Sequence, residues 1–205
     1  MQISAELRWF WEDRCPERVF AWFQDRSPNP FGEAEVRVDL YYHRSGNTQI
    51  GCKLRDAQAK SSDIVELKAL IARTDEDSIE LWAKWIWQPP IGVLGVPVRK
   101  ERWLQSCIAP VRRRTHQFVR HVERDSKSSS RTDATERQIE LTRVSVGQVE
   151  RAWWTLGFEV SGTVDSARAG LSEMLQTDLP PMEGALRLNY PEFLEMLTSK
   201  HLRRQ

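Results

Sequence analysis

The feature that most constrains this sequence is a series of short segments in which apolar residues alternate with charged residues of both signs. The segments 3–11, 49–55, 64–70 and 138–142 all follow this pattern. Side chains of a β-strand alternate between its two faces, so each segment predicts a strand with one apolar and one charged face. Four such strands indicate a sheet that curls around a polar interior, where a polyanion and a metal ion could be held.

The charged faces of these strands supply candidate site residues. The four segments contribute Glu6 and Arg8, Lys53 and Arg55, Glu66 and Lys68, and Gln138 and Glu140. The segment 98–106 alternates in the same way and adds Lys100 and Arg102. On an open sheet these residues would be solvated or would pair across strands. In a closed sheet the positive and negative charges of these residues would also have to compensate one another, because buried charges without partners are costly.

Composition narrows the class of protein. The chain has 205 residues, enough for one domain with a sizeable core, and its 30 basic and 29 acidic residues leave a formal charge of +1. This balance argues against a protein that binds duplex nucleic acid. The sequence shows no signal-peptide pattern and no apolar window that would span a membrane. Cys15, Cys52 and Cys107 fit neither a disulfide framework nor a zinc site, which favours a reducing, cytoplasmic location.

The aromatic residues divide between the two faces of the predicted strands. The chain has nine tryptophans, and four of them fall on apolar faces: Trp9, Trp11, Trp85 and Trp87. This placement predicts that the four rings lie between the sheet and its helices. Tyr41 and Trp82 fall on charged faces, where they would fill the interior or stack on a nucleobase.

The order of the elements predicts the fold class. About eight strands can be recognised, with a helix after the first strand and C-terminal helices at 165–177 and 190–200. A serine-rich stretch at about 125–135 has the composition of an exposed, mobile loop. We therefore predict a single domain over 1–205 of the α+β class, with mostly antiparallel strand pairing.

Several motifs also occur in a suggestive order. The first are Ser4-Ala5-Glu6-Leu7-Arg8, Asp39-Leu40-Tyr41-Tyr42-His43, Lys53-Leu54-Arg55 and Val65-Glu66-Leu67-Lys68. They are followed by Lys100-Glu101-Arg102, Gln138-Ile139-Glu140-Leu141 and Phe158-Glu159. In this order they resemble the CYTH domain, also called the triphosphate tunnel metalloenzyme fold, whose members open with a Glu-x-Glu-x-Lys strand. The resemblance covers roughly residues 3–197. Each motif is weak alone, and the specificity lies in their order.

The resemblance implies an eight-stranded antiparallel barrel, the tunnel, with flanking helices. Enzymes of this family hold a divalent cation with glutamates and grip a triphosphate with lysines and arginines, as the chemistry of each group favours. Carried over to this chain, the metal ligands for Mg²⁺ or Mn²⁺ would be Glu6, Glu140 and Glu159, with Glu66 as a further carboxylate. The phosphate-binding residues would be Arg8, Lys53, Arg55, Lys68, Lys100 and Arg102.

The chain departs from the family pattern in its carboxylates. Ser4 stands where the family has its first glutamate, Gln138 stands where a second late carboxylate is expected, and Arg8 replaces the lysine. Neither a serine nor an amide adds negative charge, so we expect a lower affinity for a divalent ion.

Three hypotheses remain open at this point. The first is a tunnel protein that binds an inorganic or organic triphosphate and hydrolyses it as a metal-dependent triphosphatase, with a metal-bound water as nucleophile and no protein residue assigned as catalyst. The second is a non-catalytic anion-binding module with a degenerate metal site. The third is a scaffold whose apolar, tryptophan-rich outer surface meets a partner subunit, and a homodimer is one such assembly.

Overall fold

The structure is a computed structural model that describes residues 1–26, 34–55, 64–74, 78–87, 96–108, 136–146 and 151–202. The strands are β1 (Gln2–Glu12), β2 (Glu35–Tyr42), β3 (Ile50–Leu54), β4 (Val65–Arg73), β5 (Glu80–Trp87), β6 (Val96–Ile108), β7 (Glu136–Val146), β8 (Trp153–Gly162) and β9 (Leu186–Arg187). The helices are α1 (Glu17–Arg26), α2 (Val164–Leu175) and α3 (Tyr190–Leu202). The loop predicted at about 125–135 lies outside the described residues.

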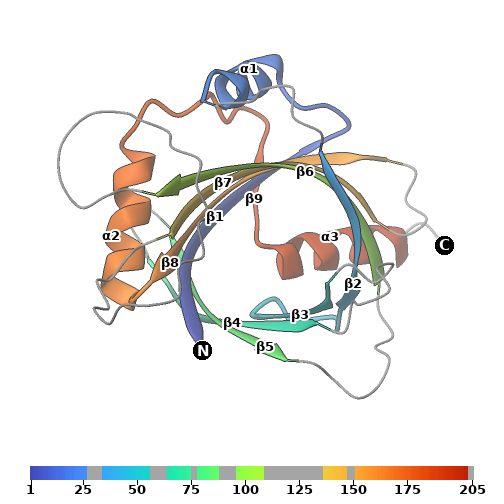
Figure 1. Cartoon of the computed structure of the whole chain (residues 1–205). Coiled ribbons are helices and arrows are strands. Elements are labelled where there is room, and N and C mark those ends of the chain that lie inside the picture. Colours follow the sequence, from blue (N-terminus) through green and yellow to red (C-terminus); the bar gives the residue numbers. More distant parts are fainter. Residues whose placement is uncertain are drawn as a thin grey trace.

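Eight of the described strands form a closed antiparallel barrel. Their order is β5-β4-β3-β2-β6-β7-β8-β1, and β5 pairs with β1 to complete the circle (Figure 1). The short β9 adds to β1 beside Trp9 and Phe10, beyond the part of β1 that pairs with β5. The predicted α+β fold, a mostly antiparallel eight-stranded barrel flanked by helices, is confirmed.

The alternation in the sequence separates the inside of the barrel from the outside. Glu6 and Arg8 line a cavity inside the barrel. Ala5 and Leu7, one position along, are buried in an apolar cluster with residues of α1 and α2. A period of two therefore sends charged residues inward and apolar residues outward, the inverse of an ordinary apolar barrel core.

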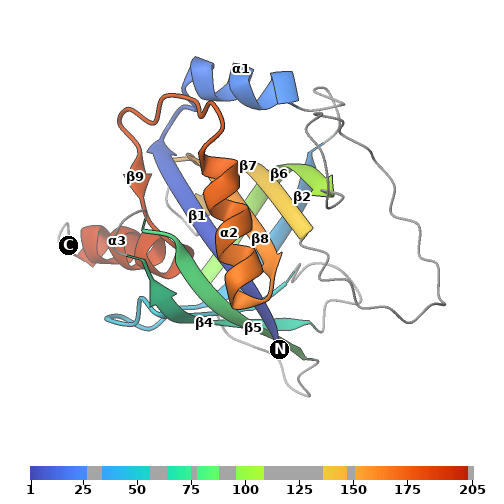
Figure 2. The ribbon, with the colours of Figure 1, turned by 90° about the vertical axis from the view of Figure 1, so that its left-hand side faces the viewer.

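Two helices cover one side of the barrel from outside. α2 lies across β1 and β8, and α1 lies near one end of these strands (Figure 2). Val19, Trp22 and Phe23 are the buried residues of α1. Thr163 begins α2 with a capping box, in which its hydroxyl accepts from the backbone N–H of Ser166 and the Ser166 hydroxyl accepts from that of Thr163.

The third helix closes one end of the barrel interior. A second apolar cluster joins α3 to inward-facing residues of five strands, and its members are Phe10, Tyr41, Val98, Val144, Val146, Trp153, Phe193, Leu194 and Leu197. The Phe10 and Phe193 rings stack with their centroids 4.2 Å apart. The predicted helices 165–177 and 190–200 thus correspond to α2 and α3, and the tunnel is filled at the end that α3 occupies.

One prediction about the tryptophans is wrong. Trp11 is buried under the helices, but Trp85 on β5 is 38% exposed. The described helices lie outside β1, β7 and β8, and Leu81 at the start of β5 joins their apolar cluster, whereas no described helix lies outside β3 and β4 (Figure 1). Alternation alone identifies the outer face of a strand but not whether a helix covers it.

No helix in the described part of the chain is long and apolar enough to cross a membrane.

Candidate functional site

The remaining part of the barrel interior is a charged cavity of about 140 Å³. That volume has room for on the order of ten water molecules, at the ~10–15 Å³ that each requires. All nine predicted site residues line it, namely Glu6, Arg8, Lys53, Arg55, Lys68, Lys100, Arg102, Glu140 and Glu159. Among the described residues, the lining contains eight basic and five acidic side chains, an excess of three positive charges.

Glu140 on β7 joins two arginines in one corner of the cavity. Its Oε1 accepts from Arg8 Nη1 at 2.9 Å, and its Oε2 accepts from Arg102 Nε at 2.8 Å. Burial favours the neutral acid, but Arg8 and Arg102 hold the pKa of the Glu140 carboxyl well below its ordinary value. Arg102 also donates to Glu35 Oε2 at 2.9 Å, so this guanidinium bridges two strands of the barrel wall.

The position of Arg8 depends on a glycine in the neighbouring strand. Gly157 on β8 is the register partner of Arg8, and a Cβ at this position would lie 2.5 Å from Arg8 Cζ. The guanidinium therefore lies directly against the backbone of β8, where Nη1 also donates to Thr155 Oγ1 at 3.2 Å. A side chain at Gly157 would therefore force the Arg8 guanidinium to shift from this position.

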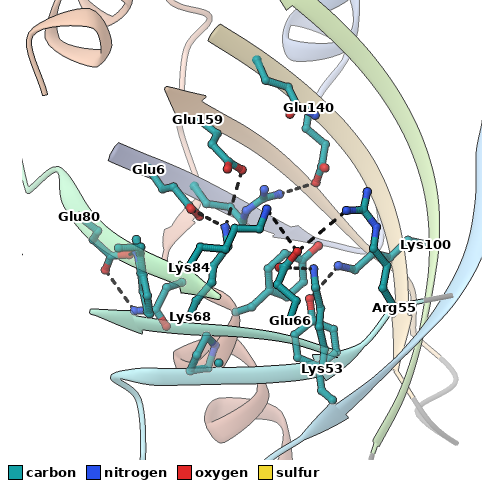
Figure 3. A pocket seen from close by; sticks show the side chains of 18 of the residues that line it. Glu6, Lys53, Arg55, Glu66, Lys68, Glu80, Lys84, Lys100, Glu140 and Glu159 are labelled. Carbon is teal, nitrogen blue, oxygen red and sulfur yellow. Dashed lines mark hydrogen bonds and ion pairs between the residues drawn. The ribbon is translucent and has the colours of Figure 1, made fainter. Parts of the chain in front are cut away.

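Glu66 on β4 is surrounded by cations. Its carboxylate lies 3.1 Å from Lys53 Nζ, 3.3 Å from Lys84 Nζ and 3.9 Å from Arg55 Nη1 (Figure 3). Burial opposes ionisation of Glu66, but Lys53, Lys68 and Lys84 lower its pKa far below the ordinary value. One carboxylate thus faces several basic side chains, of which Lys53 also lies 3.7 Å from Asp39 Oδ2.

Glu6 and Glu159 share a lysine. They are register partners on β1 and β8, and Lys68 Nζ contacts Glu6 Oε1 and lies 3.7 Å from Glu159 Oε2. Ser4 donates to Glu6 Oε1 at 2.6 Å. Burial acts to raise both pKa values, but Lys68 and Ser4 outweigh it at Glu6, whose pKa is lowered. At Glu159, burial and the nearby charge of Glu6 outweigh Lys68, and its pKa is raised.

A buried group on β2 and β6 forms the wall beside α3. Lys100 Nζ donates to the Tyr41 hydroxyl at 2.8 Å and lies 3.2 Å from Asp39 Oδ2. Arg37 lies on the other side of Asp39, with Nε 3.1 Å from Oδ1. Burial lowers the pKa of Lys100, so its positive charge depends on the anionic groups close to it.

Three lining residues come from the start of α3 and were not predicted: Asn189, Tyr190 and Pro191. Asn189 donates to Glu80 Oε1 at 3.1 Å and caps the helix, since its Oδ1 accepts from the backbone N–H of Glu192. The Tyr190 ring lies 4.1 Å from Lys100 Nζ and 4.9 Å from Arg8 Cζ, measured to the ring centroid. Its buried hydroxyl has no hydrogen-bond partner among the described residues. Strand alternation carries no signal for residues that a helix brings into the barrel.

Lys84 was also missing from the predicted phosphate-binding set. Its place beside Glu80 and Trp82 on the charged face of the segment 78–87 is a signal that could have identified it. The structure confirms that Tyr41 and Trp82 face inward, with exposed fractions of 4% and 2%. Both therefore help to fill the interior.

The predicted metal ligands do not form a common centre. Glu140 lies between two arginines, whereas Glu6 and Glu159 share the ammonium group of Lys68. Among the described residues, no group of three or more His, Cys, Asp or Glu side chains could hold a metal ion. Hard cations require several oxygen ligands, so this arrangement does not fit a Mg²⁺ or Mn²⁺ site as it stands.

Comparison with known proteins identifies no relative. No family model, no curated protein and no solved structure matches this chain significantly. Membership of the CYTH family therefore stays a prediction, and the function has to be argued from the cavity itself.

Proposed function

We propose that the barrel binds a phosphate polyanion, such as an inorganic or organic triphosphate, in its charged cavity. The observation that carries this proposal is the set of cations around Glu66. Lys53, Lys84 and Arg55 all approach this single carboxylate, and their side chains are 14%, 14% and 39% exposed. Apart from Asp39 Oδ2, which lies 3.7 Å from Lys53 Nζ, Glu66 is the carboxylate that these cations contact in common, and a multivalent anion would add negative charge to them.

Phosphate suits this arrangement better than a single carboxylate ligand does. Arginine forks and lysine ammonium groups are the usual partners of phosphate oxygens, and hydrogen bonds between charged groups are about twice as strong as neutral ones. The unpartnered Tyr190 hydroxyl adds a neutral donor to the same cavity. Arg55, the most exposed of the three cations around Glu66, would contact an entering anion first.

The contacts in the cavity favour anion binding that does not depend on a divalent metal. Lys68 already supplies a positive charge between Glu6 and Glu159, the pair of carboxylates that a metal would need. Hydrolysis by a metal-dependent triphosphatase is the other candidate, and it rests on the resemblance of the motifs to those of the CYTH family. Such hydrolysis requires a metal cation to displace Lys68 from the Glu6 and Glu159 carboxylates.

The test is calorimetric titration with tripolyphosphate in the presence of EDTA. We expect binding in wild-type protein, and weakening by roughly tenfold in Arg55→Gln and in Lys84→Gln, because each removes one charge-assisted contact worth about 1.5 kcal/mol. Arg151→Gln is the matched control. It makes the same charge change at an exposed pair with Glu12.

Two outcomes would contradict the binding proposal: absence of tripolyphosphate binding, or equal weakening in Arg151→Gln. Phosphate release is followed in parallel with Mg²⁺, Mn²⁺ or EDTA. Release that requires a metal would support the triphosphatase, and binding without release would support a non-catalytic module.

A further inference from the structure

Glu6 and Glu159 face each other on neighbouring strands inside the barrel. They are register partners in the antiparallel pair β1 and β8, and both line the cavity. Like charges directly opposite one another on two strands repel and destabilise the sheet. The two side chains are only 18% and 25% exposed, so the solvent screens this repulsion weakly. The pair therefore requires a cation close to both carboxylates.

The cation that the structure provides is the ammonium group of Lys68. Its Nζ contacts Glu6 Oε1 and lies 3.7 Å from Glu159 Oε2 (Figure 3). Lys68 lies on β4, which pairs with β3 and β5 in the described sheet, so the side chain reaches β1 and β8 through the interior. Burial favours the neutral amine, but Glu159 and Glu6 raise the pKa of Lys68 above its ordinary value. The ammonium group is therefore charged at neutral pH.

The place that this ammonium group occupies is surrounded by oxygen atoms. Gln138 on β7 is the register partner of Glu159 and also lines the cavity. Ser4 donates to Glu6 Oε1 at 2.6 Å. Carboxylate, amide and hydroxyl oxygens are the hard ligands that Mg²⁺ and Mn²⁺ bind, with water completing the coordination shell. A divalent cation and the Lys68 ammonium group would compete for the same carboxylate oxygens.

We propose that Lys68 is a built-in counter-cation, which takes the place of a divalent metal ion between Glu6 and Glu159 and closes this site to metals. The assignment differs from the predicted role of Lys68 in binding phosphate, because its ammonium group already contacts a carboxylate. One ammonium charge compensates only one of the two carboxylates. Removal of Lys68 should therefore open a site at which a doubly charged cation compensates both.

Titration with Mn²⁺ alone, followed by the electron paramagnetic resonance signal of the free ion, tests this proposal. We expect Lys68→Ala and Lys68→Met to bind Mn²⁺ more tightly than wild type by roughly tenfold or more. Adding Glu159→Gln to Lys68→Ala should abolish the gain, because it removes one of the two carboxylates. Lys84→Ala is the matched control. Lys84 is the register partner of Lys68 and lines the same cavity, but its Nζ lies 3.3 Å from Glu66 Oε2 instead.

Thermal unfolding gives a second readout, which does not require the variants to be as stable as wild type. Loss of Lys68 leaves two carboxylates without their cation, so Lys68→Ala and Lys68→Met should unfold at a lower temperature than wild type. Mn²⁺ should raise the unfolding midpoints of both variants, because an ion that binds only the folded state stabilises it. It should leave the midpoints of wild type and Lys84→Ala unchanged. For a variant that is unfolded without metal, the readout is recovery of its circular dichroism spectrum on addition of Mn²⁺.

Three results would overturn the proposal. Wild-type protein that binds Mn²⁺ as tightly as Lys68→Ala would show that Lys68 does not exclude the metal. Lys68 variants that gain neither Mn²⁺ affinity nor stability would show that the two carboxylates are not a cation site. An equal gain in Lys84→Ala would show that the effect is not specific to Lys68. These experiments contain no phosphate, so their outcome is independent of whether the cavity binds tripolyphosphate.

Discussion

At the scale of single residues, the charged interior is held together by specific pairings. Glu140 lies between two arginines, Glu66 lies among cations, and Lys68 lies between two glutamates. Buried charges that lose a partner are typically destabilising by about 3–5 kcal/mol, so each pairing constrains its neighbours. Gly157 also belongs to this arrangement, because the absence of a side chain there leaves room for Arg8.

The Gly157→Ala substitution tests this packing. The added methyl would lie 2.5 Å from Arg8 Cζ, so the guanidinium has to shift, which should weaken its hydrogen bond to Glu140. We expect a loss of about 2–3 kcal/mol in the free energy of unfolding, measured with urea. In an Arg8→Ala background the same substitution should cost much less, since the clash is gone. Additive effects in this double-mutant cycle would contradict the close contact.

At the scale of elements, α3 both closes the barrel and shapes the site. Its apolar residues fill one end of the interior, and its first turn brings Tyr190 next to Lys100 and Arg8. The helix is tied to the wall through polar contacts as well, because Glu192 binds Arg73 at 2.7 Å and Asn189 donates to Glu80. The depth of the cavity therefore depends on where α3 lies.

Phe193→Ala tests the role of α3. Phe193 is fully buried and stacks on Phe10, so its truncation leaves a cavity and should lower the free energy of unfolding by about 3–5 kcal/mol. Phe20→Ala on α1 is the control, because Phe20 is 37% exposed and its loss should cost about 1 kcal/mol or less. Equal losses in urea unfolding would show that α3 does not fill the interior.

At the scale of the whole molecule, the formal charge of +1 does not reveal that many charged side chains gather inside the barrel. Eight basic and five acidic side chains line one cavity within the described part of the chain. The apolar residues that would ordinarily fill a small barrel lie instead on its outside and at the α3 end. Stability should therefore depend on pH more steeply than the balanced composition indicates.

The pH dependence follows from three carboxyls, Glu6, Glu66 and Glu140, whose pKa values are lowered in the folded protein. Their contribution is complete above the unfolded pKa of about 4.3 and is lost as the pH falls toward the lower folded value. One such carboxyl typically contributes about 2–3 kcal/mol at neutral pH. We expect thermal unfolding midpoints to fall steeply below about pH 4, while Glu159, whose pKa is raised in the folded protein, contributes in the opposite direction as the pH rises above about 4.3.

Glu66→Gln should lower the midpoint at pH 7 and flatten this pH profile, because Lys53, Arg55 and Lys84 lose their shared counter-ion. Glu12→Gln at an exposed pair is the control and should leave the profile unchanged. A profile in Glu66→Gln as steep as in wild type would show that Glu66 does not contribute to acid unfolding.

The local pattern of the sequence was sufficient to determine much of the fold and of the site. Alternation with a period of two predicted the strands and assigned Glu6, Arg8, Lys53 and Lys68 to one face, and the structure brings these residues to one cavity. This succeeded because the side-chain direction in a strand depends only on position parity. The α+β class followed from the order of the same elements.

Only the tertiary structure decided which charged side chains pair with one another and which strand faces a helix covers. Which carboxylate meets which cation depends on strand register, and this separated Glu140 from Glu6 and Glu159 although the motifs had grouped all three as metal ligands. The entry of Tyr190 into the cavity and the exposure of Trp85 depend on where helices dock. Local sequence specifies the face of the strand on which a side chain lies. What that face contacts depends on elements distant in the sequence, because those contacts form only when the barrel closes.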